Sequence, residues 1–402
     1  MKRYPLQGYR ITDFGWTAAA PRATCILADM GAEVIKIETR RRFDPIRFGP
    51  DNVTQDPEKD PLFHSINRNK LGITLDLNYP EAIDLVKRLI KISDVVSENF
   101  SPGVMEKYGL GYDELKRIKP DIIMISFPAI GKEGPMSEVV TYGPSLASLA
   151  GLDSMIGYFG ESVIGMQQAY ADINAALHGA FAVLIALRHR QVYGEGQFIE
   201  LSQIEALIST MAEPILEYTT AGHVLGTIGN RSNIMSVHNV YRCQGDDKWV
   251  SIAIRTEEEW RAFCKAIGNP PWTKMEIFAD NYLRLEHQEE LDRLISQWTA
   301  DKTHYEVMEM LQKAGVAAAP CADTEDRFLD PHFQKREVHI PVEHSATGVD
   351  WIPGMVCKLS KTPGGVRRPA PLLGQHNQYV LGELLGLSKE TIARLEAEKI
   401  IY

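Results

Sequence analysis

The strongest constraint on the fold of this chain is the regular alternation of helix-like and strand-like segments over its first 130 residues. Apolar residues recur there at helical spacing in some segments and form short β-branched runs in others, with glycine or proline at the boundaries. Helices are expected over residues 18–30, 81–92 and 112–118, and strands over 33–38, 94–97 and 122–127. This pattern is typical of an α/β domain with a parallel sheet. Such sheets bind ligands at the carboxyl ends of their strands, where the loops at 39–42 and 98–100 are expected.

Two longer helices follow the first part of the chain. They are expected over residues 173–190 and 204–218, with a strand over 197–201 between them. From residue 222 to residue 236 the composition shifts to Gly, Asn, Ser and Thr, which is typical of a linker or a lid.

The segment beyond this linker predicts a smaller α+β domain. It begins with a hairpin over residues 241–254, which turns at Gly245-Asp246-Asp247, and helices are expected over 257–267, 289–298 and 304–314. We therefore expect a large domain over residues 1–224, a small domain over 225–325, and a C-terminal segment over 326–402 that ends in a helix.

Charge and composition exclude several classes of protein. The 402 residues are 44% hydrophobic and 24% charged, which is typical of a globular chain, and the net charge is −10. Nucleic-acid binding is disfavoured, because it needs a basic surface that displaces counterions from phosphates. The N-terminus has no apolar stretch of signal-peptide length, and the apolar run at 173–187 is shorter than the roughly 20 residues that span a bilayer. We expect a buried helix there and no membrane partner.

Motifs for metals, nucleotides and hydrolysis are missing from the sequence. The five cysteines form no CxxC pair, which suits a reducing cytoplasm, and no histidines pair at metal-ligand spacing, so no metal is expected. The segment Gly109-Leu110-Gly111 lacks the third glycine of a dinucleotide-binding loop, and HExxH and GxSxG are absent.

Asp172 precedes the apolar helix, at its expected N-cap position. Aspartate is among the best N-cap residues, so a purely structural role explains the pattern. The same position also suits a nucleophile, because exposed helix amides and the positive end of the helix dipole favour the ionised carboxylate. The pattern alone leaves both roles open.

The segment from Tyr170 to Gly179, which reads YADINAALHG and continues as a second block to Ala206, is the most specific part of the sequence. Further blocks occur along nearly the whole chain: MGAEVIKIE at 30–38, NRNK at 67–70, DVVSENFSPG at 94–103, YGP at 142–144, GNR at 229–231 and DKWV at 247–250. In order and spacing they resemble the class III CoA-transferases, the family of formyl-CoA transferase and carnitine CoA-transferase.

This resemblance implies that Asp172 attacks an acyl-CoA thioester, forming first a mixed anhydride and then an aspartyl-CoA thioester. It also implies a Rossmann-like large domain to which residues 326–402 return, and coenzyme A as a substrate. The matching positions for CoA binding are Arg40, Arg41, Arg42, Asn69, Lys70, Asn99, Phe100 and Lys107. A solvated basic loop or ordinary loop structure is the alternative role of these residues.

Two departures from formyl-CoA transferase bear on the substrate. Gly143 replaces a glutamate, and residues 222–229 replace a lid of four glycines. The resemblance is closer to transferases for larger acids such as benzylsuccinate, with succinyl-CoA as a donor. A glycine at 143 is expected to leave room for a larger acyl group.

Relatives of this kind form interlocked dimers, so a homodimer or a heteromer with a related subunit is expected. An acyl-CoA racemase, which shares the fold, and a non-catalytic subunit of a heteromeric transferase are the alternatives. A racemase uses a His/Asp pair, and the sequence places no histidine in such a pair.

Overall fold

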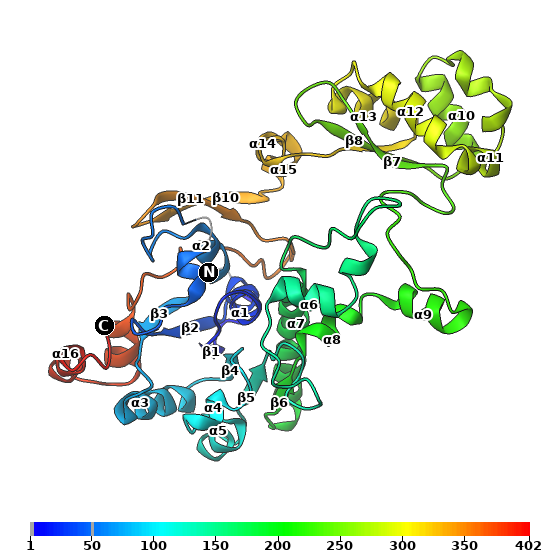
Figure 1. Ribbon diagram of the computed structural model, residues 1–402. Coiled ribbons are helices and arrows are strands. Elements are labelled where there is room, and N and C mark those ends of the chain that lie inside the picture. Colours follow the sequence, from blue (N-terminus) through cyan, green and yellow to red (C-terminus); the bar gives the residue numbers. More distant parts are fainter. Residues whose placement is uncertain (1–3, 50–51) are drawn as a thin grey trace. The chain divides into compact units, whose positions relative to one another are not determined.

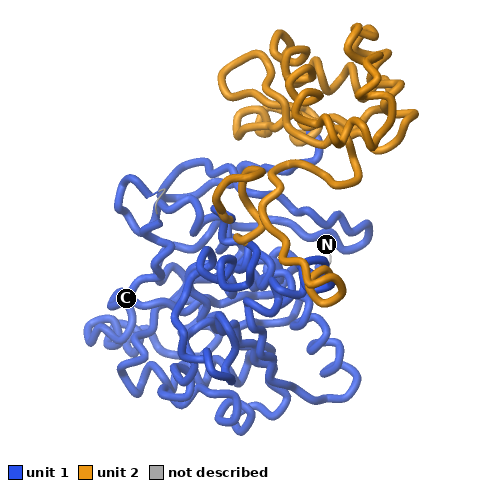
Figure 2. The backbone as a smooth tube through the Cα atoms, turned by 45° about the vertical axis from the view of Figure 1, so that its right-hand side comes forward, with its two compact units in different colours: residues 1–152, 166–216, 335–402 blue, residues 153–165, 217–334 orange. Residues whose placement is uncertain are grey.

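The computed structural model describes residues 4–49 and 52–402, which divide into two compact units (Figure 2). Unit 1 comprises Met1–Leu152, Met166–Leu216 and Lys335–Tyr402, and unit 2 comprises Asp153–Gly165 and Glu217–Gln334. Each unit is therefore assembled from segments that are separated in the sequence. The domain boundaries expected at residues 224 and 325 stay predictions, because compact units are not the same as domains that fold independently.

Unit 1 is built on a six-stranded parallel sheet (Figure 1). The strands are β1 (Arg10–Asp13), β2 (Glu33–Glu38), β3 (Leu71–Thr74), β4 (Val95–Glu98), β5 (Ile123–Ser126) and β6 (Phe198–Glu200). Their order, β3-β2-β1-β4-β5-β6, is that of the Rossmann fold, in which the direction of strand addition reverses beside β1. The α/β fold with a parallel sheet is confirmed, whereas β1 and β3 were not predicted.

Helices cover both faces of this sheet because neighbouring strand residues point to opposite sides. Val95 packs into a core with α1 (Ala19–Asp29) and α7 (Tyr170–Tyr193). The next residue, Val96, packs into the opposite core with α3 (Pro80–Lys91), α5 (Tyr112–Ile118) and α16 (Lys389–Ala397). Both faces of the strands are thus buried, as parallel sheets require.

The helix expected over residues 204–218 is two helices, and that prediction is wrong. α8 (Gln203–Ile208) ends before residue 209, and α9 (Ala212–Ala221) starts after a break of three residues. Pro214 explains the break, because its ring would clash with the carbonyl of residue 210 in a continuous helix. The Ser209 and Thr210 hydroxyls donate to the carbonyls of Ala206 and Leu207 within the break.

The remaining elements of unit 1 are short. They comprise α2 (Pro61–Asn67), α4 (Val104–Lys107), α6 (Gly143–Leu149), the 3₁₀ turn η1 (Pro45–Phe48), the π-helical segment η5 (Gln378–Leu384) and the antiparallel hairpin of β10 (His339–His344) and β11 (Gly348–Pro353). The hairpin comes from the C-terminal segment, so this segment contributes directly to unit 1.

Unit 2 has a three-stranded antiparallel sheet and its own hydrophobic core. Its strands are β7 (Val237–Arg242), β8 (Trp249–Ile254) and β9 (Ala317–Pro320). Its helices are α10 (Glu257–Ala266), α11 (Asn281–Glu286), α12 (Gln288–Thr299), α13 (His304–Lys313), α14 (Thr324–Leu329) and α15 (Pro331–Lys335). The last of these, α15, ends at the boundary with unit 1. The expected hairpin and the expected helices near 257–267, 289–298 and 304–314 are confirmed. Positive φ angles at Gly245 and Asp247 form the turn.

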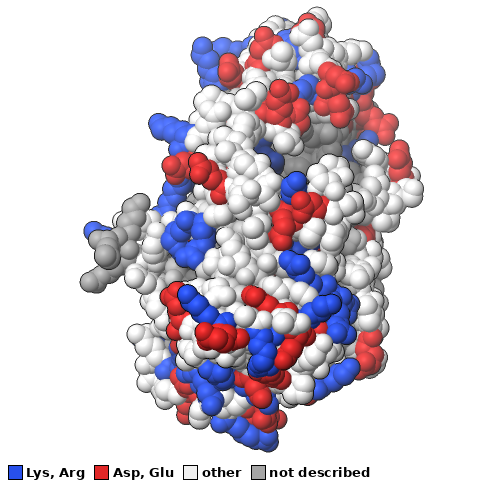
Figure 3. Space-filling model, turned by 90° about the vertical axis from the view of Figure 1, so that its left-hand side faces the viewer, with Lys and Arg blue, Asp and Glu red and all other residues white. Residues whose placement is uncertain are grey.

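One face of α7 is buried and the other is exposed, so the burial expected for this helix is confirmed for one face. Among the described residues, α7 is the helix whose length and composition are sufficient to cross a membrane, yet half of its apolar window is buried inside the protein. On the face shown in Figure 3, acidic and basic side chains are interspersed rather than gathered by sign.

Candidate active site

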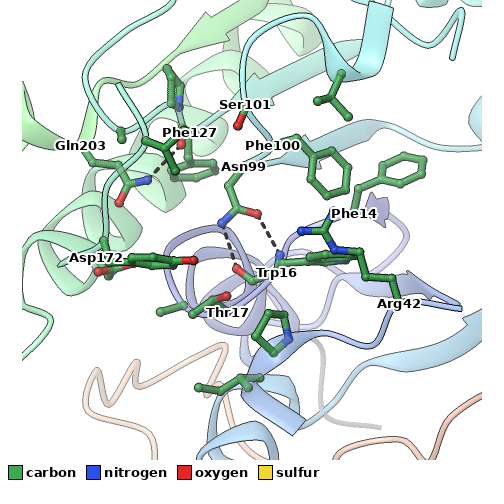
Figure 4. Close-up of a pocket in the computed structure, with 18 of the residues that line it drawn as sticks. Phe14, Trp16, Thr17, Arg42, Asn99, Phe100, Ser101, Phe127, Asp172 and Gln203 are labelled. Carbon is green, nitrogen blue, oxygen red and sulfur yellow. Dashed lines mark hydrogen bonds between the residues drawn. The ribbon is translucent and has the colours of Figure 1, made fainter. Parts of the chain in front are cut away.

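A cavity of about 820 Å³ lies in unit 1 at the carboxyl ends of the parallel strands. The loops after four strands supply much of its wall: Trp16 after β1, Arg42 after β2, Asn99 after β4 and Phe127 after β5 (Figure 4). This is the edge at which the strand order reverses, and α/β sheets of this type bind ligands there. The loops at 39–42 and 98–100 are confirmed at this edge.

Asp172 lies in the wall of this cavity, in the first turn of α7. The helix begins at Tyr170 and its N-cap is Ala169, so the expected N-cap position of Asp172 is wrong. Tyr170 and Ala171 already have helical geometry, although the apolar periodicity that predicted the helix starts only after Asp172.

Two helix N-termini meet at the Asp172 carboxylate. It accepts hydrogen bonds from its own backbone N–H in α7 and from the N–H of Ala19, the first residue of α1. Neither Ala18 nor Ala169, the N-caps of these helices, forms a side-chain capping bond. Asp172 therefore supplies from a distant part of the chain the acceptor that a capping residue of α1 would normally provide.

Gly143, the first residue of α6, lies directly against the same carboxylate. A Cβ atom at this position would be 2.3 Å from Asp172 Oδ2 and 3.0 Å from the Ala169 Cβ, closer than atoms can approach. The space beside Gly143 is thus taken by the carboxylate of Asp172. The expectation that this glycine makes room for a larger acyl group stays a prediction.

Burial raises the pKa of Asp172 above its ordinary value. The backbone N–H of Asp172 itself, the Arg22 guanidinium on α1 and the Ala19 N–H all favour the charged form but do not outweigh burial. A partly desolvated carboxylate is a stronger nucleophile than a fully hydrated one, provided that it remains ionised at the working pH.

Basic and aromatic side chains form another part of the cavity. The Arg42 guanidinium lies 5.0 Å from the centre of the Trp16 ring, and Phe100 packs edge-on against Trp16 at 5.5 Å between ring centres. Arg41 Nε donates to Asp76 Oδ2 at 2.8 Å. In Figure 4, Asp172 and Arg42 lie toward opposite sides of the pocket. The cavity thus combines a carboxylate with a separate cationic and aromatic surface.

Asn99 fixes the loop that carries Trp16. Its Oδ1 accepts from the Trp16 N–H and its Nδ2 donates to the Trp16 carbonyl, both at 2.8 Å. Gln203 similarly donates to the Phe127 carbonyl at 3.0 Å (Figure 4). The sequence did not single out Trp16, Arg22 or Gln203. A signal for Trp16 existed, since it closely follows the buried strand β1.

Four of the positions matched to CoA contacts lie outside the cavity wall among the described residues: Arg40, Asn69, Lys70 and Lys107. The Arg40 guanidinium stacks over the Tyr402 ring at 5.7 Å, and Lys107 ends the short helix α4. Arg41, Arg42, Asn99 and Phe100 are in the wall.

Asn69 and Lys70 are buried and have partners within the chain. The Lys70 ammonium donates to Asp13 Oδ2 at 2.9 Å, and neither side chain is exposed. Asn69 donates to the carbonyl of Gly365 and accepts from the N–H of Arg367, so it holds the C-terminal segment against unit 1. Both side chains are thus occupied by partners inside unit 1.

A group that could bind a metal occurs elsewhere in unit 1. The ligand atoms of His64, His344 and Asp350 lie within 4.8 Å of one another. However, His64 is already bonded on both nitrogens, to Asp350 Oδ2 at 2.8 Å and to the Glu58 carbonyl at 2.9 Å. A metal would have to displace one of these bonds. The group links α2 to the β10–β11 hairpin, and the expectation that the protein needs no metal stays a prediction.

The comparisons with known proteins agree on one family. The family model described as "CoA-transferase family III" matches residues 6–377. A succinyl-CoA–D-citramalate CoA-transferase of Chloroflexus aurantiacus is 34% identical over 99% of this chain and 98% of its own length. A succinate–glutarate CoA-transferase of Agrobacterium fabrum is 31% identical over 98% of both chains.

A solved structure supports the same assignment. The crystal structure of a CAIB/BAIF family protein from Brucella suis is 27% identical, with a TM-score of 0.88 over 95% of this chain and 100% of that one. The cavity, the partly buried aspartate and these matches along nearly the whole length lead to one conclusion. The chain belongs to CoA-transferase family III and is a CoA-transferase that uses CoA thioesters as substrates.

Proposed function

We propose that this protein transfers CoA from succinyl-CoA to a small dicarboxylic acid, with Asp172 as the covalent nucleophile. The observation that carries the proposal is the position of Asp172, whose carboxylate lies in the cavity wall against the N-terminal amides of α1 and α7. A surface carboxylate with a purely structural role would not need to face a cavity of this size.

The reaction requires four acyl transfers. The Asp172 carboxylate attacks the thioester carbonyl of succinyl-CoA, and the C–S bond breaks to give a mixed anhydride and CoA thiolate. The thiolate then attacks the aspartyl carbonyl and releases succinate. The acceptor carboxylate attacks the resulting aspartyl-CoA thioester, which frees the thiolate again. The thiolate finally attacks the acyl carbonyl of the acceptor and restores the Asp172 carboxylate.

The helix N-termini around Asp172 serve these steps. In each attack on the aspartyl carbonyl, negative charge develops on an oxygen that lies near the Ala19 N–H. Amide donors that are fixed in place before the reaction stabilise such an oxyanion without reorganising. One thioester replaces another, so the overall exchange needs neither ATP nor a metal.

The cationic and aromatic part of the cavity is the proposed site for the nucleotide of CoA. Arg41 and Arg42 suit phosphates, and guanidinium groups also stack on rings such as adenine. Asn99 and Phe100 shape the adjacent loop. Arg40, Asn69, Lys70 and Lys107 remain weaker proposals for contacts with CoA.

The proposed acceptor is an aliphatic acid of four or five carbons. Relatives that match nearly the whole chain are named for D-citramalate, L-malate and glutarate. The acids in these names are all aliphatic, which favours an aliphatic acceptor over an aromatic one. Benzylsuccinate therefore becomes the competitor to be tested rather than the preferred substrate.

The comparison of acceptors has a definite expected order. With succinyl-CoA as donor, kcat/KM should be higher for malate, citramalate or glutarate than for benzylsuccinate, formate or oxalate. A buried aromatic ring is worth about 1.5–3 kcal/mol, so a pocket built for benzylsuccinate would reverse this order by tenfold or more. That reversal would contradict the proposed substrate class while leaving the transfer chemistry intact.

An acyl-CoA racemase is the alternative function. Among the described residues, the wall of the cavity contains no histidine that could form a His/Asp pair with Asp172. This observation favours transfer. Exchange of the proton next to the thioester carbonyl, in deuterated water and without a second acid, would indicate a racemase instead.

The surface of α7 bears on how the protein assembles. The exposed face of α7 carries Leu177, Phe181 and Ile185, which are 59%, 64% and 51% exposed and follow one another at helical spacing. An apolar stripe of this kind is typical of a protein interface. We propose an interlocked homodimer, or a heteromer with a related subunit, that works in the cytoplasm. A similar chain is the beta subunit of a succinyl-CoA–L-malate CoA-transferase of Chloroflexus aurantiacus, 32% identical over 99% of this chain and 98% of its own length.

Replacement of Asp172 tests the nucleophile directly. Asp172→Asn and Asp172→Ala should each lower the transfer rate by on the order of 10³-fold or more. The other carboxylates of the cavity wall, Glu38 and Asp76, are held in ion pairs with Arg47 and Arg41. With succinyl-CoA, the wild-type protein should carry an acyl adduct on Asp172, trapped by hydroxylamine or borohydride and located by mass spectrometry. Loss of the capping bond should cost only about 1 kcal/mol of stability.

Asp113→Asn is the matched control, since Asp113 is an exposed carboxylate in the first turn of α5. It should retain wild-type activity and the trapped adduct. Transfer by Asp172→Ala at a rate close to that of the wild type would refute the assignment.

A further inference from the structure

A second cavity lies entirely within unit 2, and no step of the proposed transfer uses it. Its volume is about 240 Å³, and its wall includes Phe159, Arg231, Ser232, Leu285 and Gln288. This volume suits a small organic acid, whereas a whole coenzyme A molecule is far larger. The residues come from three separate parts of unit 2, so the cavity is formed by the fold of that unit.

The decisive observation is the side chain of Gln288. This residue is only 6% exposed, yet its Nε2 atom has no hydrogen-bond partner among the described residues. Buried side-chain donors in folded proteins nearly always have a partner. Because Gln288 also lines the cavity, its amide group indicates a ligand that accepts hydrogen bonds.

The neighbouring polar groups are donors as well. The Arg231 guanidinium stacks 4.0 Å from the centre of the Phe159 ring, and its ion pair with Glu289 at 3.3 Å reaches a side chain that is 81% exposed. Several of its N–H groups therefore remain available. Ser232 Oγ accepts from two backbone N–H groups at 3.2 Å, which leaves its hydroxyl proton to donate.

The backbone adds positive potential at the same place. Gln288 is the first residue of α12, a helix of 12 residues whose N-cap, His287, makes no side-chain capping bond. The first turn of a helix leaves N–H groups without partners inside the helix, and the helix dipole favours an anion there. Glu289 and Glu290 are the acidic residues of this turn, and Glu290 is paired with Arg293.

We propose that unit 2 contains a binding site for a small carboxylic acid, with Arg231 and Gln288 holding its carboxylate and Ser232 donating a further bond. The apolar walls, Phe159 and Leu285, would contact a short hydrocarbon body. Asp292 is outside the wall of this cavity, and its two oxygens accept from Tyr241 and Asn239, so its hydrogen-bonding capacity is directed away from the proposed ligand. The site goes beyond the proposed transfer and does not depend on Asp172.

The test is a titration of the full-length protein labelled with ¹⁵N in its glutamine side chains. The signal of Gln288 is assigned from its loss in Gln288→Leu, and succinate, succinamide and inorganic phosphate are the probes. We expect succinate to shift the Gln288 signal saturably and uncharged succinamide to leave it unchanged. Gln203, in the wall of the larger cavity, reports separately on acid binding there.

Substitutions of Arg231 test whether its guanidinium holds the ligand. Arg231→Met should weaken the binding that Gln288 reports by at least tenfold, and Arg231→Lys should restore part of it. Arg261→Met, an exposed change on α10 outside the wall of this cavity, should have no effect. The proposal would be overturned if the Gln288 signal did not shift with succinate, or shifted equally with succinamide. It would also be overturned if the signal shifted only with phosphate, or if Arg231→Met left the shift unchanged. Because binding at Gln203 and transfer activity are measured apart, failure of the proposed function would not be confused with failure here.

Discussion

At the scale of single residues, the reactivity of Asp172 is set by opposing influences. Burial raises the pKa of the carboxyl, whereas two backbone N–H groups and the Arg22 guanidinium lower it, and burial prevails. A folded pKa above the unfolded value means that ionisation of Asp172 weakens the folded state. This cost appears as the pH rises through the folded pKa, so it is fully present when the nucleophile is active.

This balance predicts the pH dependence of the enzyme. The acid limb of the kcat/KM profile should rise with the deprotonation of Asp172, and its midpoint should lie above the ordinary aspartate value of 3.8. Arg22→Met should move the midpoint to higher pH, because it removes a charge that favours the carboxylate, and Arg22→Lys should move it back.

Arg88→Met, on α3 at the opposite face of the sheet, is the control and should leave the profile unchanged. A loss of rate in Arg22→Met without any movement of the midpoint would assign Arg22 a purely structural role. The measurement is the pH–rate profile at low substrate concentration, which reports groups of the free enzyme.

At the scale of elements, the start of α6 and the N-termini of α1 and α7 define the place of the nucleophile together. α1 begins at Ala19 and α7 at Tyr170, and the Asp172 carboxylate accepts from both helices. α6 contributes a surface without a side chain, since Gly143 touches the carboxylate through its backbone. The position of the nucleophile therefore depends on the contact between helices that are distant in the sequence.

Gly143→Ala tests this arrangement. The added methyl group would meet Asp172 Oδ2 at 2.3 Å, so the carboxylate must move. A displacement of about 1 Å lowers a rate by roughly 10²-fold, and kcat should fall by that order while the affinity for CoA stays near the wild-type value. Alanine also favours a helix more than glycine does, so thermal unfolding should show no large loss of stability.

Gly365→Ala is the matched control, because its Cβ would meet nothing within 4 Å. Its activity and stability should be those of the wild type. Full activity of Gly143→Ala would show that the Asp172 carboxylate can move aside without loss of rate, which would contradict this prediction.

At the scale of the whole molecule, the stripe of Leu177, Phe181 and Ile185 on α7 is an apolar surface that is not covered within unit 1. Phe181 lies in the middle of this stripe. Phe181→Glu should convert an assembly of at least twice the chain mass of 45.1 kDa into a monomer in sedimentation experiments, because a charge cannot be buried in an apolar interface without a partner.

Val53→Glu, which changes a side chain that is 90% exposed and outside the stripe, should leave the assembly unchanged. A wild-type protein that sediments as an active monomer would contradict the proposed assembly. A chain that assembles only after a related subunit is added would favour the heteromer over the homodimer.

The sequence predicted the parts of the fold that follow from local periodicity. β2, α3, α5 and the unit 2 hairpin were within reach because apolar spacing and turn residues define each of them. β1 and β3 were missed although they are as long as β4 and β5, which were predicted. The break before α9 follows from Pro214, whose ring would clash with the carbonyl four residues before it.

The site was predictable in its chemistry but not in its geometry. The family blocks pointed to Asp172, and the loops at 39–42 and 98–100 followed from the rule for strand ends. The contact of Gly143 with Asp172 and the bond from Ala19 depend on tertiary packing, which no local pattern contains. For the same reason, Asn69 and Lys70 match CoA-contact positions in sequence, whereas in the structure both are buried and bonded to partners outside the cavity wall.

The hydrogen bond from Ala19 to Asp172 links the chemical state of the carboxylate to the stability of the first turn of α1. Once the carboxylate becomes an anhydride or a thioester, it loses its charge, and α1 loses the anion that stabilises its first turn. In the proposed mechanism, each catalytic cycle would loosen and then retighten the start of a core helix. The acylated enzyme should therefore exchange the amide hydrogens of that turn faster than the resting enzyme, although acylation also removes the cost of burying the charge.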